Sequence, residues 1–129
     1  MDHDSGVTHP KFRMWLRPDG IVQMTWASHV TINLEDAAEA ISAMTELTGG
    51  RRSPLSVDLH DSGQPSRPAR LEFTHREDLV SAVALVVGTP LSRIMGNFYL
   101  GVSRPPYPVR LFDDEASALA WLRAFIGSP

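Results

Sequence analysis

The chain opens with two segments in which apolar and polar residues alternate. Residues 11–17 place one set of side chains inward and the other outward: Phe12, Met14 and Leu16 against Lys11, Arg13, Trp15 and Arg17. Residues 21–26 repeat the pattern with Val22, Met24 and Trp26. A period of two residues is typical of a strand buried on one face. Because Pro18, Asp19 and Gly20 between the segments favour a tight turn, we predict an antiparallel hairpin.

The apolar spacing then becomes helical. Asn33 offers a capping oxygen, Gly49 ends the pattern, and the apolar positions between them are Leu34, Ala37, Ala38, Ile41, Met44 and Leu47. A short helix is predicted over residues 66–74, because Ser66 is a good N-cap and Pro68 suits a first turn. Two more helices are predicted over 89–102 and 113–126, the last with an apolar face of Ala118, Leu119, Leu122, Phe125 and Ile126.

Three further strands separate these helices, at residues 54–59, 79–87 and 107–112. The middle one is a continuous apolar run, which predicts a strand buried on both faces. The order ββαβαβαβα is typical of an α/β (α+β) domain, in which a mixed sheet begins with an antiparallel hairpin and helices pack on it. We therefore predict a single domain over residues 11–129, preceded by a disordered tail over residues 1–10.

Composition narrows the functional classes. Cysteine is absent, which excludes disulfides, thiolate zinc sites and a cysteine nucleophile. The net charge is −3, so nothing global attracts nucleic acid or anionic lipid, although eleven arginines stand against the single Lys11. Because no apolar run reaches about 18 residues, we expect no membrane span, and the acidic, histidine-containing N-terminus does not resemble a signal peptide. A cytoplasmic protein is predicted.

The C-terminal third of the chain resembles a known protein family. The stretch Ala82–Phe125, and within it RLFDDEASALAWL at residues 110–122, resembles the end of SpoIIAA-like proteins of the STAS/Sec14-like superfamily. The element order resembles the STAS domain of bacterial anti-sigma-factor antagonists, and the chain looks like a member of an uncharacterised bacterial subgroup of that fold. The resemblance implies a SpoIIAA-like fold and a non-enzymatic, regulatory protein-interaction module, with self-association as a further expectation.

The resemblance also suggests a regulatory site. STAS antagonists carry a phosphorylatable serine where a helix follows the third strand, in a motif resembling D-S-S-G. Ser62 matches that motif in part, whereas Ser66 matches it by its position at a helix start. Arg67 and Arg70 lie beside Ser66, and a phosphate is favoured at a helix N-terminus. The alternatives are a site for a phosphate-bearing ligand or an acidic partner, or a serine that serves only as a helix cap.

Four residues are predicted as parts of an interaction surface. Trp15 lies on the polar face of its strand, between two arginines. It is expected to contact a partner unless loops or the N-terminal tail cover it. Arg76 ends the segment 62–76, which we expect a partner to contact. Asn97 and Tyr99 follow an interior glycine of the third helix, which is otherwise an ordinary core helix. The Pro-rich connection 104–108 either displays Tyr107 to a partner or directs the last strand.

The sequence gives little support to an enzymatic function. The five histidines show no metal-binding spacing, no triad can be assigned, and we expect no cofactor and no metal. The alternative to an interaction module is a domain that binds a small apolar or phosphate-bearing ligand, such as a lipid or nucleotide, in a cavity beneath residues 91–102. A third reading is an enzyme acting on phosphate esters, which needs His60, Arg67 and Arg70 to converge.

Overall fold

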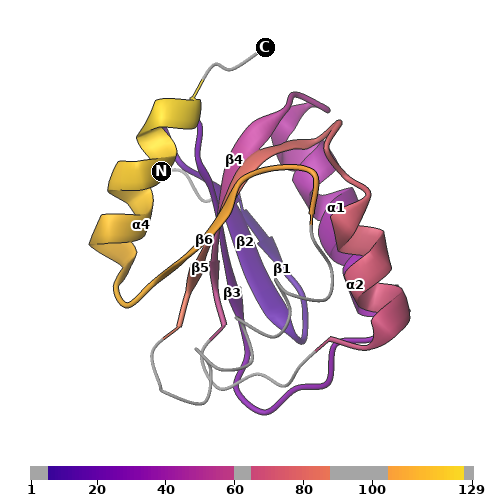
Figure 1. Cartoon of the computed structure of the whole chain (residues 1–129). Helices are drawn as coiled ribbons and strands as arrows, with labels where there is room; N and C mark the ends of the chain where they lie inside the picture. Colours follow the sequence, from indigo (N-terminus) through magenta and orange to yellow (C-terminus); the bar gives the residue numbers. More distant parts are fainter. Residues whose placement is uncertain (1–5, 60–64, 88–104, 127–129) are drawn as a thin grey trace.

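The fold is built on a six-stranded sheet with helices on both faces (Figure 1). The computed structural model describes residues 6–59, 65–87 and 105–126. The strands lie side by side in chain order: β1 Gly6–Thr8, β2 Phe12–Leu16, β3 Val22–Trp26, β4 Ser53–Asp58, β5 Val80–Val86 and β6 Val109–Phe112. The first three are antiparallel, and β3 to β6 are parallel. The predicted α/β class, opening hairpin and mixed sheet are confirmed.

Helices α1 (Leu34–Thr48) and α2 (Arg67–Thr74) cover one face, and α4 (Glu115–Leu122) covers the other (Figure 1). The first two connect parallel strands in the same direction across the sheet, and right-handed crossovers then place both helices on one face. A 3₁₀ turn at Arg123–Phe125 continues α4. The helix predicted over 89–102 lies outside the described residues. Within those residues, no helix is long and apolar enough to span a membrane.

The N-terminal segment corrects one prediction. Residues 1–10 were expected to be a disordered tail, but Gly6–Thr8 pair with β2, Gly6 opposite Trp15 and Thr8 opposite Arg13. His9 and Phe12 close the connecting turn through backbone hydrogen bonds of 2.8 and 3.3 Å. Backbone pairing supplies partners for the N–H and C=O groups of β2 and needs no apolar pattern, which is why so short a strand left no signal in the sequence.

The buried face of α1 also differs from the prediction. Ala37 and Met44 are buried as expected, but Ala40 and Ala43 are buried as well, while Leu34 remains 46% exposed. Asp36 points toward the sheet side of the helix to bond Lys11. A residue two positions earlier lies about 200° around the helix, so the side chain of Leu34 faces outward. Alanines on the inner face let α1 lie close to the strands.

The face of the sheet under α4 has its own apolar cluster. Its buried members come from β5, from α4 and from the residue before β3: Ala82, Ala84, Val86, Ala118, Leu119, Leu122 and Ile21. All of β5 is buried, which confirms the strand predicted to be covered on both faces. The cap of α4 is Asp114, one residue later than predicted, because its side chain accepts the Ser117 amide at 2.7 Å.

Candidate functional site

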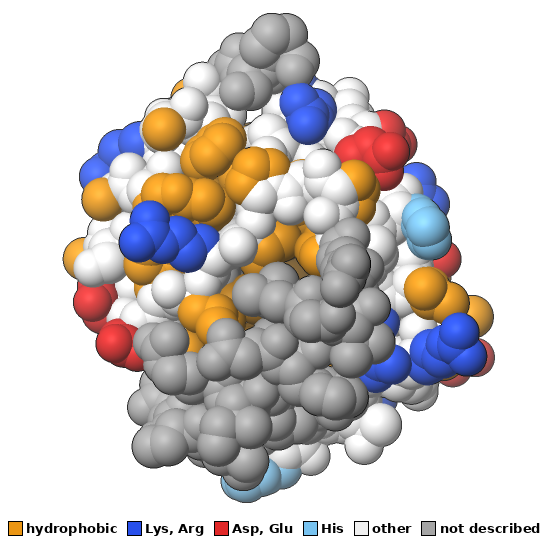
Figure 2. Space-filling model, in the orientation of Figure 1, with side chains coloured by type: hydrophobic (Ala, Val, Ile, Leu, Met, Phe, Trp, Pro, Cys, Tyr) orange, Lys and Arg blue, Asp and Glu red, His pale blue; other side chains and the backbone are white. Residues whose placement is uncertain are grey.

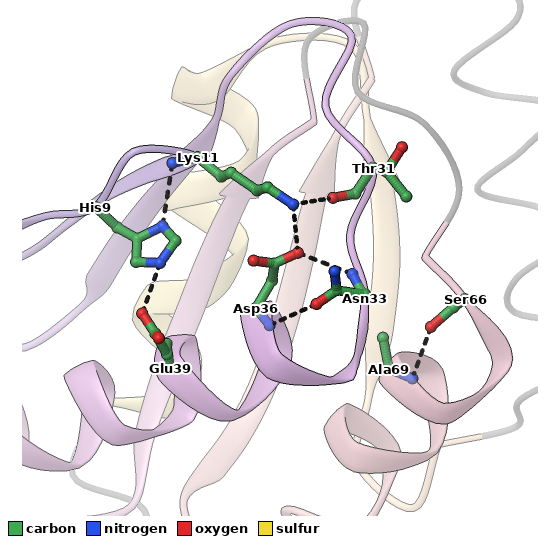
Figure 3. A network of polar contacts seen from close by, with 8 residues as sticks. All are labelled: His9, Lys11, Thr31, Asn33, Asp36, Glu39, Ser66 and Ala69. Carbon is green, nitrogen blue, oxygen red and sulfur yellow. Dashed lines mark hydrogen bonds and ion pairs between the residues drawn. The ribbon is translucent and has the colours of Figure 1, made fainter.

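Ser66 lies at the start of α2, where its side chain serves as the N-cap. The Oγ atom accepts a hydrogen bond from the Ala69 amide at 3.3 Å (Figure 3). The backbone amide of Ser66 donates to the carbonyl of Ile32 at 2.9 Å, which holds the start of α2 against the segment entering α1. The predicted helix start is therefore confirmed, with a half-buried hydroxyl engaged as an acceptor.

Arg67 and Arg70, predicted beside Ser66, and Arg76, predicted on the interaction surface, have different surroundings. Arg67 is exposed, whereas Arg70 is half-buried and donates to the Pro65 carbonyl at 3.0 Å. Arg76 follows the other end of α2 and pairs with Glu72 at 3.6 Å and Asp78 at 3.7 Å. A helix of eight residues is about 12 Å long. Arg67 and Arg70 therefore accompany Ser66, while Arg76 is held by carboxylates at the opposite end.

One side of α2 faces away from the protein. Ala69 and Thr74 are buried against the rest of the domain. The opposite side carries a leucine that is 46% exposed, at helical spacing from exposed neighbours: Arg67, Pro68, Leu71 and His75, which we call the outward face of α2. The sequence could have indicated the outward face of α2, because helical spacing places Leu71 on the same side as Arg67 and His75 and not on the side of Ala69.

A second polar cluster joins the hairpin to the first turn of α1 (Figure 3). The ammonium group of Lys11 donates to the Asp36 carboxylate at 2.8 Å and to the Thr31 carbonyl at 2.8 Å. Asp36 also accepts from the backbone amide of Asn33, whose side chain accepts in return from the Asp36 amide. Burial by itself raises the pKa of Asp36, but the hydrogen bonds from Asn33 and Lys11 outweigh it and hold that pKa below its ordinary value.

His9 lies next to this cluster and uses both ring nitrogens. Its Nδ1 atom accepts from the Lys11 amide at 3.0 Å, and its Nε2 atom lies 2.6 Å from the Glu39 carboxylate. The ring stacks on Phe12 with 4.4 Å between centroids. These contacts hold the β1–β2 turn against α1. Sequence reasoning missed the cluster, since its members are separated by up to 30 positions and follow no motif.

Trp15 lies on the opposite side of the sheet from α2. Its indole nitrogen donates to the Gln23 side chain at 3.0 Å, and Gln23 in turn donates to Glu115 at the start of α4. The guanidinium of Arg13 sits over the indole ring, 5.4 Å from its centroid. The ring is half-buried and tied into the fold. The structure therefore does not bring Trp15 together with Ser66, and any surface containing Trp15 is a separate one.

Several predicted positions fall outside the described residues: Ser62, Asn97, Tyr99, His60 and the segment 91–102 proposed to cover a cavity. Tyr107 is described and is only 6% exposed, with its hydroxyl donating to the Phe73 carbonyl at 2.8 Å. The reading in which the Pro-rich connection displays this side chain is therefore wrong. In the described part of the chain, no three histidine or carboxylate side chains come together as a metal site.

Comparisons with known proteins support the fold. The family model described as "Domain of unknown function (DUF7793)" matches residues 14–126. None of the curated proteins matches the chain. A crystal structure of an uncharacterised DUF3478-family protein with a SpoIIAA-like fold, from Shewanella loihica PV-4, is similar with a TM-score of 0.64 and 14% identity, over 90% of this chain and 97% of that one. This likeness confirms the predicted SpoIIAA-like fold and carries no further conclusion about activity.

A protein of unknown function from Arthrobacter sp. FB24 shares 30% identity, over 84% of this chain and 90% of that one, with a TM-score of 0.33.

Proposed function

Because this chain belongs to the DUF7793 family and has a SpoIIAA-like fold, we propose that it is a non-enzymatic protein-interaction module with a regulatory role. Its partner binds the outward face of α2, and Ser66 is the residue through which binding is regulated. A cytoplasmic setting and self-association belong to the same proposal. The arginines predicted for this segment support it, because Arg70 beside Ser66 and Arg76 at the other end of α2 are engaged in local structural contacts rather than directed together at one reacting group.

The observation that carries the proposal is the pairing of Leu71 with Arg67. Leu71 is 46% exposed, and no ion pair engages the guanidinium of Arg67 among the described residues. A single exposed leucine is common, but arginine is enriched at protein interfaces, and here an apolar side chain lies beside an uncompensated guanidinium on a capped helix. A partner that contributes an apolar residue and a carboxylate would satisfy both groups at once.

The start of α2 favours a protein partner over a free phosphate ligand. Pro68 has no amide hydrogen, and the amide of Ala69 already donates to Ser66. Few backbone donors are therefore left for an anion at this helix end. A phosphate attached to Ser66 is different, since it is held covalently next to Arg67 and adds about two negative charges beside the outward face of α2. We expect such a modification to change partner binding.

Capture from native lysate with matched variants tests the binding surface. Wild-type protein is compared with Arg67→Glu/Leu71→Asp and with the control Arg51→Glu/Ala120→Asp, which makes equivalent changes at exposed positions away from α2. We expect a stoichiometric protein partner that the control retains and the α2 variant loses at least tenfold. A partner retained equally by all three proteins contradicts the α2 surface. No partner specific to the wild type and control contradicts the interaction module.

Mass spectrometry of protein purified from its native cells tests the regulatory residue. Phosphate on Ser66, with partner capture altered in the Ser66→Asp variant, supports the proposal. Phosphate confined to Ser62, or to neither serine, removes Ser66 as the regulated site and leaves the α2 surface standing.

A further inference from the structure

Among the described strands, β6 lies at one edge of the sheet, and no described strand pairs with the backbone groups on its outer side. The carbonyls of Pro108 and Phe112 accept from the amides of Val83 on β5 and of Val87 directly after it, each at 2.9 Å. In a parallel ladder alternate residues turn to the same neighbour, so Arg110 also faces β5. Val109 and Leu111 therefore direct their N–H and C=O groups outward. In the described part of the chain, no further strand pairs with them.

The side chains at this edge combine one charge with an apolar surface. Arg110 is exposed, and its guanidinium lies over the ring of Phe112, 5.3 Å from the centroid. No described carboxylate pairs with it. Phe112 continues into an aromatic cluster with Trp121 and Phe125, with centroids 5.6 and 5.0 Å apart. Figure 2 looks onto this side of the molecule, where hydrophobic side chains gather over β6 and α4.

Charge decides which kind of strand fits the edge. If two copies of this chain paired through both outward residues, Val109 of each would lie opposite Leu111 of the other, and Arg110 would lie directly opposite Arg110 of the second copy. Like charges opposite one another destabilise a strand pair. A strand with a carboxylate at that position instead compensates Arg110, and apolar neighbours on it extend the contact with Phe112.

We propose that the β6 edge binds an extended, acidic-apolar segment of another protein by strand addition. Backbone hydrogen bonds from Val109 and Leu111 provide affinity, and a glutamate or aspartate opposite Arg110 provides selectivity. In an antiparallel arrangement the partner reads, from its N-terminus, an apolar residue opposite Phe112, an apolar residue opposite Leu111, the acid, and an apolar residue opposite Val109. This proposal goes beyond the proposed function, because the β6 edge is separate from α2. An experiment can contradict binding at one of the two surfaces without contradicting binding at the other.

Blocked synthetic peptides test the edge directly. The probe is Thr-Val-Val-Glu-Val-Thr and its matched control is Thr-Val-Val-Lys-Val-Thr, each titrated into isotope-labelled protein to millimolar concentration. We expect the amide signals of Val109 and Leu111 to shift. The glutamate peptide should bind about fivefold more tightly than the lysine peptide, given a cross-strand charge effect of about 0.5 kcal/mol in each direction. Arg110→Glu should reverse that order.

N-methylated peptides provide a test that does not depend on a protein variant. Methylation of the third or fifth peptide nitrogen blocks a donor directed at β6 and should abolish binding, whereas methylation of the glutamate nitrogen should preserve it. Arg67→Glu/Leu71→Asp should bind the probe unchanged, which separates this edge from the α2 surface. Equal binding of both peptides, shifts located away from β6, tolerance of every methylation, or a wild-type dimer through β6 by sedimentation would each overturn the proposal.

Discussion

The indole nitrogen of Trp15 donates a 3.0 Å hydrogen bond to Gln23, the residue directly opposite it on β3. Gln23 is only 6% exposed, and its amide nitrogen donates to the Glu115 carboxylate on α4. One side chain thereby connects the hairpin with the last helix. Arg17 also donates to the Gln23 oxygen, at 3.3 Å. Trp15, predicted as part of an interaction surface, therefore also contributes to the structure of the domain.

Replacing Gln23 by leucine should therefore destabilise the fold. The variant leaves the Trp15 donor and the Glu115 acceptor without this partner in a semi-buried site, and we expect a loss of about 1–3 kcal/mol in the free energy of unfolding. Urea denaturation measures it, and the indole N–H signal of Trp15 should move in a nitrogen–proton spectrum. Thr25→Val, on the same face of β3, serves as the control. A loss below about 0.5 kcal/mol would contradict a structural role.

The Lys11–Asp36 pair predicts a dependence of stability on pH. The pKa of Asp36 in the folded protein lies below its ordinary value of 3.8, so the ionised carboxylate favours folding. That contribution is fully present above 3.8 and is lost as the pH falls through the lower folded-state pKa. Asp36→Asn should cost about 1–2 kcal/mol at neutral pH, since it weakens the capping box and the ion pair.

Chemical denaturation at several pH values between about 5 and 3 measures the effect. The wild type should lose stability over this range, and Asp36→Asn should lose less. Asp19 acts in the same direction, because hydrogen bonds from Arg17 and the Ile21 amide outweigh its burial and lower its pKa. Glu46→Gln, at an exposed position on α1, is the control and should follow the wild type. Parallel curves for the wild type and Asp36→Asn would refute the linkage.

The cap of α2 can be separated from its regulatory role. Ser66→Ala should reduce the free energy of unfolding by about 1 kcal/mol, because the Ala69 amide loses its acceptor. Ser66→Asp keeps an acceptor and should stay within about 0.5 kcal/mol of the wild type. Thermal or urea unfolding measures both, with Ser42→Ala on the exposed side of α1 as the control. If Ser66→Asp were as unstable as Ser66→Ala, loss of the hydrogen-bond acceptor would not be the cause of the destabilisation.

The end of α1 provides a test of backbone conformation alone. Gly49 has a φ of 68°, and a Cβ atom added there would meet no other atom within 4 Å. Gly49→Ala should therefore cost about 1 kcal/mol through the left-handed conformation and not through a clash. Gly49→Asn should cost less, since asparagine tolerates this region. Denaturant midpoints distinguish the two, and equal losses for both variants would argue for a different cause.

Local sequence patterns predicted most of the fold. Alternation identified β2 and β3, the continuous apolar run identified β5, and serine followed by proline located the start of α2. Three features escaped these patterns. The pairing of Gly6–Thr8 depends on an open edge of β2, the rotation of α1 depends on the Asp36–Lys11 contact, and the Asp114 cap depends on which of two adjacent aspartates reaches an amide.

The sequence likewise predicted some residues of the candidate site and missed others. Ser66 and Arg67 are neighbours in sequence, and the helix keeps them together. Leu71 was overlooked because exposure is a property of packing, although helical spacing already placed it beside Arg67. The tie from Trp15 through Gln23 to Glu115 joins residues as much as 100 positions apart, which no local pattern encodes.

For Trp15, the sequence by itself determined the strand, the polar face and the neighbouring arginines, because side-chain direction along a strand follows from a two-residue period. Only the tertiary structure decided what that face meets. The crossovers place α1 and α2 on one side of the sheet and leave α4 to the other, so that Glu115 reaches Gln23, and Gln23 in turn holds Trp15. Local periodicity sets orientation, whereas long-range packing sets partners, and the function of a surface depends on both.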